Sequence, residues 1–274
     1  MKVLPAALAL ALLLSLPGTI SVSGEAASAL DEVKWCRASI PTEGETGDWV
    51  LASGSNVRHL TRAVDGTLYC YASPSGTSYT LFKSTDAGRS WSHTGKVTDT
   101  IVDIATAPDD ASIIYYASTS DVYKSDDAGI SFTRLPLNPG GAGSDNVTIA
   151  SMDVTRLDGR SIVAVGTSDA DAAQYGGVYI LDEEKPFAGW IDTAIGSYDI
   201  CELAFSPKFT SDRQLVAVAS NEIDTLITTR IDDADWGGVT SSVTVSGLAS
   251  ISAGYCLPRR LRCHQRRFRS VCGC

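Results

Sequence analysis

The stretch STDAGRSW at residues 84–91 is followed by SDDAGISF at residues 125–132. Both fit one eight-residue pattern: Ser, any residue, Asp, Ala, Gly, any residue, Ser, and then Trp or Phe. The Asp carboxylate can accept hydrogen bonds from backbone N–H groups of a turn, and the Gly tolerates a positive φ. The aromatic residue then starts the next strand and can bury ~150–250 Å² between neighbouring sheets. The pattern predicts two copies of one hairpin turn, which joins the third and fourth strands of a repeated unit.

The residues that this pattern singles out have predicted structural roles. They are Ser84, Asp86, Gly88, Ser90 and Trp91 in the first copy, and Ser125, Asp127, Gly129, Ser131 and Phe132 in the second. We predict no catalytic, cofactor-binding or metal-binding residue, and therefore no cofactor.

A longer repeat surrounds each octapeptide. The strands predicted in the second copy span residues 101–106, 113–118, 122–125 and 132–135, with turn residues between them. In the first copy, YCYAS at 69–73 matches IYYAS at 114–118, and LFKS at 81–84 matches VYKS at 122–125. Each copy therefore reads as four short strands joined by turns.

Two weaker copies follow the clear ones. They begin at residues 150–168 and 201–220 and run to Trp190 and Trp236. The turn landmarks Pro108, Asp158, Pro207 and Pro258 are separated by 50, 49 and 51 residues. A repeat of this period, with four strands and a recurring aromatic residue in each unit, is typical of a β-propeller. We therefore predict an all-β propeller of four-stranded blades over residues 58–254, with about four recognisable blades and a truncated C-terminal end.

The octapeptide S-x-D-x-G-x-[ST]-[WF] resembles the Asp-box, also called the BNR repeat. This repeat is found in sialidases, sortilin-type receptors, xyloglucan-cleaving glycosidases and photosystem II assembly factors. The resemblance covers roughly residues 58–246. It implies an Asp-box β-propeller of the sialidase-like superfamily, with the Asp-boxes on its outer edge, away from an active centre. It implies a fold and no particular activity.

The N-terminal part of the sequence indicates export. Lys2 precedes an apolar run and small residues follow it, which is the order of a secretory signal peptide with its cleavage region at residues 1–29. The alternative is an uncleaved anchor, which the shortness of the apolar run disfavours. Residues 30–57 form a leader in which 33–41 is a candidate strand that closes the ring. We expect a secreted or cell-surface protein with no membrane span after cleavage.

The charge is distributed unevenly along the chain. The net charge is −10, yet no acidic residue follows Asp235, and six arginines lie beyond that position. An acidic body argues against nucleic acid and anionic membranes as partners. The basic, Cys-rich tail at 255–274 is expected to be out of frame; the alternative is a genuine tail that binds a metal or an anionic surface. Cys36, Cys70 and Cys201 are expected to be buried thiols, with one disulfide left open.

The sequence shows no recognisable catalytic set. A sialidase would need an arginine triad that begins in an Arg-Ile-Pro motif, and RASIP at 37–41 is not that motif. An inverting glycosidase needs two carboxylates ~6.5–9.5 Å apart, but nothing distinguishes one pair among 32 acidic residues. The acidic clusters at 169–172 and 232–235 lack the spacing of a calcium loop and are interpreted as solvated turns.

These observations favour a non-enzymatic role. We predict an exported, monomeric β-propeller scaffold whose loops bind a protein or polysaccharide partner. The alternative is an exo-acting glycosidase related to sialidases. A central face that gathers arginines and paired carboxylates would distinguish the second function from the first.

Overall fold

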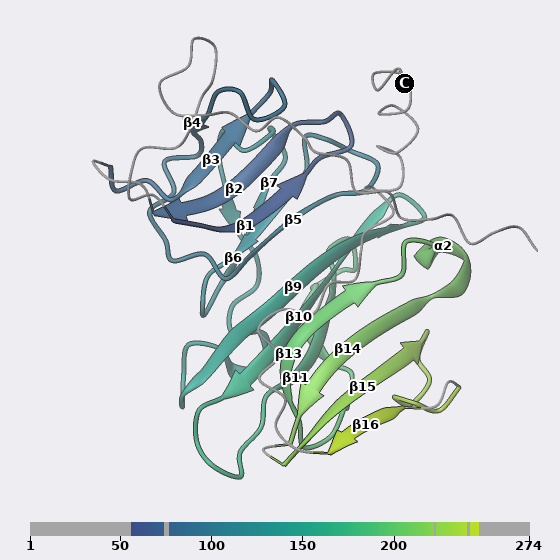
Figure 1. Cartoon of the computed structure of the whole chain (residues 1–274). Helices are drawn as coiled ribbons and strands as arrows, with labels where there is room; N and C mark the ends of the chain where they lie inside the picture. Colours follow the sequence, from purple (N-terminus) through teal and green to yellow (C-terminus); the bar gives the residue numbers. More distant parts are fainter. Residues whose placement is uncertain (1–55, 74–76, 222, 240–241, 247–274) are drawn as a thin grey trace, which may run out of the picture. The chain divides into compact units, whose positions relative to one another are not determined.

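The computed structural model describes residues 56–73, 77–221, 223–239 and 242–246. All of them belong to the same structural unit, Pro41–Cys274. They form four antiparallel sheets of four strands each, which Figure 1 shows in chain order from purple β1 to yellow-green β16. The predicted all-β fold of four-stranded propeller blades is confirmed.

Three predicted features lie outside the described residues. These are the signal peptide at 1–29, the closing strand at 33–41 in the leader, and the tail at 255–274.

The first two sheets contain the octapeptides. Sheet 1 consists of β1 (Asn56–Arg62), β2 (Leu68–Ser73), β3 (Leu81–Ser84) and β4 (Ser92–His93). Sheet 2 consists of β5 (Asp103–Thr106), β6 (Ile114–Ala117), β7 (Val122–Ser125) and β8 (Thr133–Arg134). The octapeptides lie between β3 and β4 and between β7 and β8, where the pattern predicts them.

The last two sheets have longer strands. Sheet 3 consists of β9 (Val147–Leu157), β10 (Arg160–Asp169), β11 (Gly177–Asp182) and β12 (Ile191–Asp192). Sheet 4 consists of β13 (Asp199–Phe205), β14 (Gln214–Ser220), β15 (Asp224–Ile231) and β16 (Val243–Ser246). Short helical turns, η1 (Pro139–Gly141) and α2 (Phe209–Asp212), occur in the connections. No helix in the described part of the chain is long and apolar enough to span a membrane.

The pairing of strands within sheets 1 and 2 shows which residues of the first two repeats are equivalent. Tyr69 pairs with Lys83 in sheet 1, and Tyr115 pairs with Lys124 in sheet 2. In each pair the lysine ammonium lies over the tyrosine ring, 5.6 Å and 5.9 Å from its centre. The match of 69–73 with 114–118 is therefore wrong by one residue, because the runs YCY and IYY look alike in either register.

Apolar clusters fill the spaces between successive sheets. Their members include Tyr69, Leu81, Ile114 and Tyr116 between sheets 1 and 2, Tyr115, Val122, Val163 and Leu181 between sheets 2 and 3, and Ile162, Val178, Ile200 and Leu203 between sheets 3 and 4. Burial of one such side chain contributes ~1.5–3 kcal/mol. Each sheet thus depends on its neighbours for stability.

Gly166 on β10 allows sheets 3 and 4 to approach closely. A Cβ atom at this position would lie 2.3 Å from Cγ2 and 2.7 Å from Cβ of Ile200 on β13. A side chain at position 166 would therefore force the two sheets apart. The absence of a side chain here fixes the spacing at which their first strands meet.

The two described cysteines differ in exposure. Cys70 is 1% exposed, as predicted, but Cys201 is exposed, and both are free thiols. The prediction of burial for Cys201 is wrong because the residue occupies an irregularity in β13, between Ile200 and Glu202, where it has no partner on β14.

Candidate functional site

Each of the four sheets contributes one polar residue of its first strand to a continuous row, here called the first-strand row. It consists of His59 on β1, Asp103 on β5, Ser151 on β9 and Glu202 on β13. Ser151 lies 48 residues after Asp103 and 51 residues before Glu202, so the row follows the period of the repeat. Neighbouring first strands contact one another, which brings these distant residues together.

Bulges help to aim these side chains. The register shifts between Val57 and His59 on β1, and between Ile200 and Glu202 on β13. On β9 the shift falls just before Ser151. An extra residue bends a strand and redirects the side chain that follows it. In three of the four sheets the polar residue therefore comes directly after the irregularity.

The polar side chains of one first strand bind the backbone of the next. Met152 N donates to Asp103 Oδ2 at 3.0 Å, and Leu203 N donates to Ser151 Oγ at 3.2 Å. Phe205 N donates to Oδ2 of Asp153 at 2.8 Å. A buried N–H group without a partner costs about 1–3 kcal/mol. These side chains therefore tie sheet 2 to sheet 3, and sheet 3 to sheet 4.

Two carboxyl groups of the row share the hydroxyl of Ser151. Ser151 Oγ lies 3.5 Å from Asp103 Oδ2 and 3.1 Å from Glu202 Oε1. Burial raises the pKa of Asp103 to about 6, against the opposing effect of the Met152 N–H group. Burial, and then the charge of Asp103, raise the pKa of Glu202 to about 7. The two groups therefore titrate close to neutral pH.

His59 lies at the other end of the row. Its Nδ1 atom is 3.9 Å from Asp103 Oδ1, so the two can form an ion pair when the imidazole is protonated. Burial, and then the charge of Arg58, lower the pKa of His59. Both effects favour the neutral imidazole over the protonated one.

The chemistry available to the row is limited. Two carboxyl groups with raised pKa values can donate or accept protons, but a hydroxyl that is 1% exposed lies between them. Within the described part of the chain, no group of three His, Cys, Asp or Glu residues is placed to hold a metal ion. The arrangement suits hydrogen bonding between strands better than it suits an open reaction centre.

The octapeptide residues lie apart from this row, at the turns between the third and fourth strands. In the first copy, Asp86 Oδ1 accepts hydrogen bonds from Ser84 Oγ at 2.8 Å and from Ser90 N at 2.9 Å. Asp86 Oδ2 accepts one from Ser90 Oγ at 2.6 Å. Gly88 has a φ of 89°, and its N–H donates to Ser84 Oγ at 2.9 Å. The carboxylate and the hydroxyls together close the turn.

The second copy repeats this geometry. Asp127 accepts hydrogen bonds from Ser125 Oγ at 2.7 Å, and from the backbone N–H and the hydroxyl of Ser131 at 2.9 and 2.6 Å. Gly129 has a φ of 85°, and its N–H donates to Ser125 Oγ at 2.8 Å. Hydrogen bonds from Ser131, and likewise from Ser90 in the first copy, lower the pKa of each Asp to about 2.

The two aromatic residues of the octapeptides pack differently. Phe132 contacts the cluster between sheets 1 and 2, where its ring lies edge-on to Tyr116 at 4.9 Å. Trp91 packs on Cys70 and Phe82 of its own sheet, and its Nε1 atom donates to Gly88 O at 3.0 Å. The predicted role between sheets therefore fits the contacts of Phe132, whereas the contacts of Trp91 lie within sheet 1.

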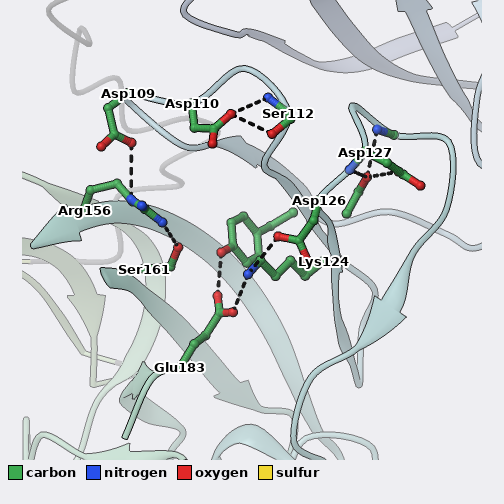
Figure 2. A network of polar contacts seen from close by, with 12 residues as sticks. Asp109, Asp110, Ser112, Lys124, Asp126, Asp127, Arg156, Ser161 and Glu183 are labelled. Carbon is green, nitrogen blue, oxygen red and sulfur yellow. Dashed lines mark hydrogen bonds and ion pairs between the residues drawn. The ribbon is translucent and has the colours of Figure 1, made fainter. Parts of the chain in front are cut away.

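A second polar network joins sheets 2 and 3, as Figure 2 shows. The Lys124 ammonium lies 2.8 Å from Glu183 Oε2 and 3.0 Å from Asp126 Oδ1, and Tyr115 donates its hydroxyl to Glu183 Oε1 at 2.5 Å. Because Glu183 directly follows β11, this network ties the octapeptide turn of sheet 2 to sheet 3. The single ammonium of Lys124 is shared by two carboxylates, and Glu183 is also bound by the Tyr115 hydroxyl, so these groups are engaged in the contact between the sheets.

The sequence analysis missed the first-strand row. The segments IVDIAT, IASMDVT and DICELAF each carry a polar residue inside an apolar run, close to the repeat period. A polar residue that recurs at one position of a buried strand is the signal that could have indicated the row. This recurrence alone does not show that the side chains contact one another, because the residues in contact are about 50 positions apart in the sequence.

Comparisons with known proteins add resemblances in fold. No protein-family profile matches the chain, and no curated protein matches its sequence. Among solved structures, the chain is similar to YCF48 bound to D1 peptide, with 12% identity and a TM-score of 0.43 over 72% of this chain and 55% of that one. It is also similar to a GH74 xyloglucanase from Xanthomonas campestris, with 16% identity and a TM-score of 0.46 over 70% of this chain and 31% of that one.

A third similar structure is an α-L-arabinanase from Penicillium chrysogenum, complexed with arabinobiose. It shows 13% identity and a TM-score of 0.41, over 76% of this chain and 70% of that one. This chain spans about half of the YCF48 structure and about a third of the xyloglucanase. The fold assignment therefore rests on the four sheets of the chain itself, and none of these activities is transferred to it.

Proposed function

We propose that this chain is an exported Asp-box β-propeller that binds a protein or polysaccharide partner and catalyses no reaction. The observation that carries the proposal is the position of the Ser151 hydroxyl, within 3.5 Å of both carboxyl groups of the first-strand row. Leu203 N–H holds this hydroxyl in place. The polar residues that could form a reaction centre instead form hydrogen bonds between the sheets.

A glycosidase needs an open space between its two carboxyl groups. These groups flank the glycosidic bond, ~5–5.5 Å apart in retaining enzymes and ~6.5–9.5 Å apart in inverting ones. Here Asp103 and Glu202 both reach Ser151 Oγ, and Asp103 also accepts the Met152 N–H bond. A sugar ring cannot enter between them unless Ser151 and its strand move. The geometry therefore supports binding over catalysis.

The turns present apolar side chains on which a partner can dock. Phe187 is fully exposed, and Ile130 and Leu137 are 74% and 54% exposed. Trp190 Nε1 donates to Pro136 O at 2.8 Å, which joins the loops that carry Leu137 and Phe187. Aromatic residues that a partner desolvates contribute strongly to binding energy. Phe187 is therefore our main candidate for contact with the partner.

One observation favours the glycosidase alternative. The pKa of Asp103 is raised to about 6 and that of Glu202 to about 7, and a general acid near neutral pH needs such a raised value. An acid of this kind also arises wherever a carboxyl group is buried for structural reasons. The alternative therefore depends on turnover being observed.

An assay of hydrolysis and binding on the same protein tests the proposal. We expect no release of sialic acid and no cleavage of xyloglucan or arabinan oligosaccharides above the buffer rate. Retardation of the protein on gels that contain these polysaccharides then separates a polysaccharide partner from a protein partner. If retardation occurs, Phe187→Ala should weaken it, whereas Ile223→Ala, an exposed apolar residue before β15, serves as the matched control. Saturable turnover that Glu202→Gln abolishes would overturn the proposal.

A further inference from the structure

The side chain that follows each member of the first-strand row packs towards the preceding sheet. Ile104, Met152 and Leu203 occupy this position in sheets 2, 3 and 4, and they are only 6%, 3% and 3% exposed. Each belongs to the apolar cluster between its own sheet and the one before it. In sheet 1 the same position, directly after His59, is Leu60, which is 62% exposed. Sheet 1 therefore carries an apolar side chain that fits a preceding sheet.

A position on the third strand of each sheet packs towards the following sheet. Leu81, Val122 and Val178 occupy it in sheets 1, 2 and 3, and they are at most 1% exposed. Each pairs with a second-strand residue whose own partner is the member of the first-strand row. In sheet 4 this register leads to Ile227, which is 41% exposed, beside Val243 at 56%. Sheet 4 therefore carries an apolar face that fits a following sheet.

These two positions meet at every boundary between described sheets. The pairs that share one apolar cluster are Leu81 with Ile104, Val122 with Met152, and Val178 with Leu203. A repeat buries equivalent residues in equivalent contacts between neighbouring units. Ile227 of sheet 4 and Leu60 of sheet 1 are the two halves of the same contact, and both are exposed. Each end of the row of sheets thus presents the surface that the other end fits.

The first-strand row extends this match to polar groups. Met152 N donates to Asp103, and Leu203 N donates to Ser151. By position, Glu202 is the next acceptor of the row, and the backbone N–H of Leu60 is the corresponding donor at the other end. A carboxylate at this position can accept a backbone N–H just as Asp103 does. The polar and the apolar contacts therefore point to the same neighbour, which is the first strand of sheet 1.

We propose that two copies of this chain form a closed dimer, in which sheet 1 of each copy packs on sheet 4 of the other. Leu60 of one copy lies beside Ile227 of the other, and its N–H donates to Glu202 there. A head-to-tail contact gives a ring when its rotation closes. Each copy supplies four sheets, so two copies reach the upper end of the range of about 4–8 blades in β-propellers, whereas three exceed it. This dimer differs from the monomer predicted from the sequence, because the spacing of the repeats does not reveal which side chains are exposed.

Light scattering on the full chain, combined with gel filtration over a dilution series, gives the first test. We expect a mass twice that of the denatured chain. Leu60→Asp and Ile227→Asp each place an unpaired charge in the contact, so each should raise the dissociation constant of the dimer at least about tenfold. The matched control is Ile191→Asp, which changes a residue that is 53% exposed on β12 of sheet 3. A wild-type mass of one chain, or equal weakening by the control, would overturn the proposal.

Val57 and Val218 provide a cross-link that reports the arrangement itself. Their equivalents where sheets 3 and 4 meet are Ile200 and Gly166, and a Cβ atom on Gly166 would lie 2.7 Å from Cβ of Ile200. In sheet 1 the position of Gly166 is held by Tyr71, so a boundary of this kind also accommodates larger side chains at a wider spacing. Because a disulfide joins Cβ atoms about 3.5–4.5 Å apart, cysteines at positions 57 and 218 should form one across the dimer contact.

Co-expression of a Val57→Cys chain with a Val218→Cys chain tests whether this bond joins two copies, because neither chain can form it alone. Mild oxidation followed by non-reducing peptide mapping distinguishes the bond between positions 57 and 218 from any bond of the natural cysteines. We expect at least a tenfold higher yield than for the matched control pair, Ile191→Cys with Val218→Cys. A control-level yield would overturn the proposal.

A chain that carries both Val57→Cys and Val218→Cys completes the test. If the bond forms within this chain but not between two chains, sheet 4 packs on sheet 1 of the same copy and the dimer is excluded. None of these measurements uses a protein or polysaccharide partner, so this inference and the proposed function fail separately.

Discussion

Replacement of Tyr115 by Ala is expected to lower the free energy of unfolding by about 3–5 kcal/mol, the usual cost of removing a large buried ring. Tyr115 on β6 is 0% exposed and belongs to the cluster between sheets 2 and 3, with Leu181 and Val163. Its hydroxyl also donates to Glu183. The substitution therefore opens a cavity and removes a polar tie between the same two sheets.

Tyr115→Phe separates these two contributions. It keeps the ring and removes only the hydroxyl, while Lys124 still pairs with Glu183, so the expected loss is about 1–3 kcal/mol. Urea denaturation, followed by tryptophan fluorescence, measures both variants. A loss of less than about 1 kcal/mol for Tyr115→Ala would show that sheets 2 and 3 do not pack through this ring.

The stability of the protein is expected to be highest near pH 4 and to decline on either side. Asp103 has a pKa of about 6 in the folded protein, against an ordinary value of 3.8. Between these values the folded state binds more protons than the unfolded state, so stability is lost as the pH rises. The difference corresponds to about 2–3 kcal/mol between pH 4 and pH 7. Glu202, with a raised pKa of about 7, changes stability in the same direction.

The decline at low pH has the opposite cause. Asp86 and Asp127 have pKa values of about 2 in the folded protein, so their stabilising contribution is present above pH 3.8 and is lost as the pH falls towards 2. Melting temperatures between pH 2 and pH 8 measure both declines. Asp103→Asn should reduce only the decline of the melting temperature above pH 4, and Asp86→Asn only its decline below pH 4. A melting temperature that rises steadily from pH 4 to pH 7 would contradict the account.

The fold could be predicted from the sequence because its turns are local. Within one octapeptide, Asp86, Gly88 and the two serines carry the chemistry that closes the hairpin, and the pattern recurs around Asp127 and Gly129 with the same hydrogen bonds. The weaker third and fourth repeats lack the octapeptide but keep alternating apolar strands at the same period. A period of this kind can be counted without knowledge of any contact between sheets.

The first-strand row could not be predicted for the opposite reason. Asp103 and Glu202 are linked through Ser151, which lies on a strand between theirs. Their meeting depends on bulges and on the spacing between sheets, which Gly166 sets against Ile200. The same limit explains why the packing of Trp91 within sheet 1 was not predicted, because the pattern specifies an aromatic residue but not the surface on which it packs.

Polar side chains of the first strands of sheets 2 and 3 each hold the next sheet in place through its backbone N–H groups. Amide hydrogen exchange of Met152, Leu203 and Phe205 tests it most directly, in the wild-type protein and in Asp103→Ala. We expect exchange of the Met152 amide to accelerate at least tenfold in the variant, because this amide loses its carboxylate acceptor. The amides of Leu203 and Phe205, which bind Ser151 and Asp153, should change little. An unchanged Met152 rate, or equal acceleration of all three amides, would contradict the claim.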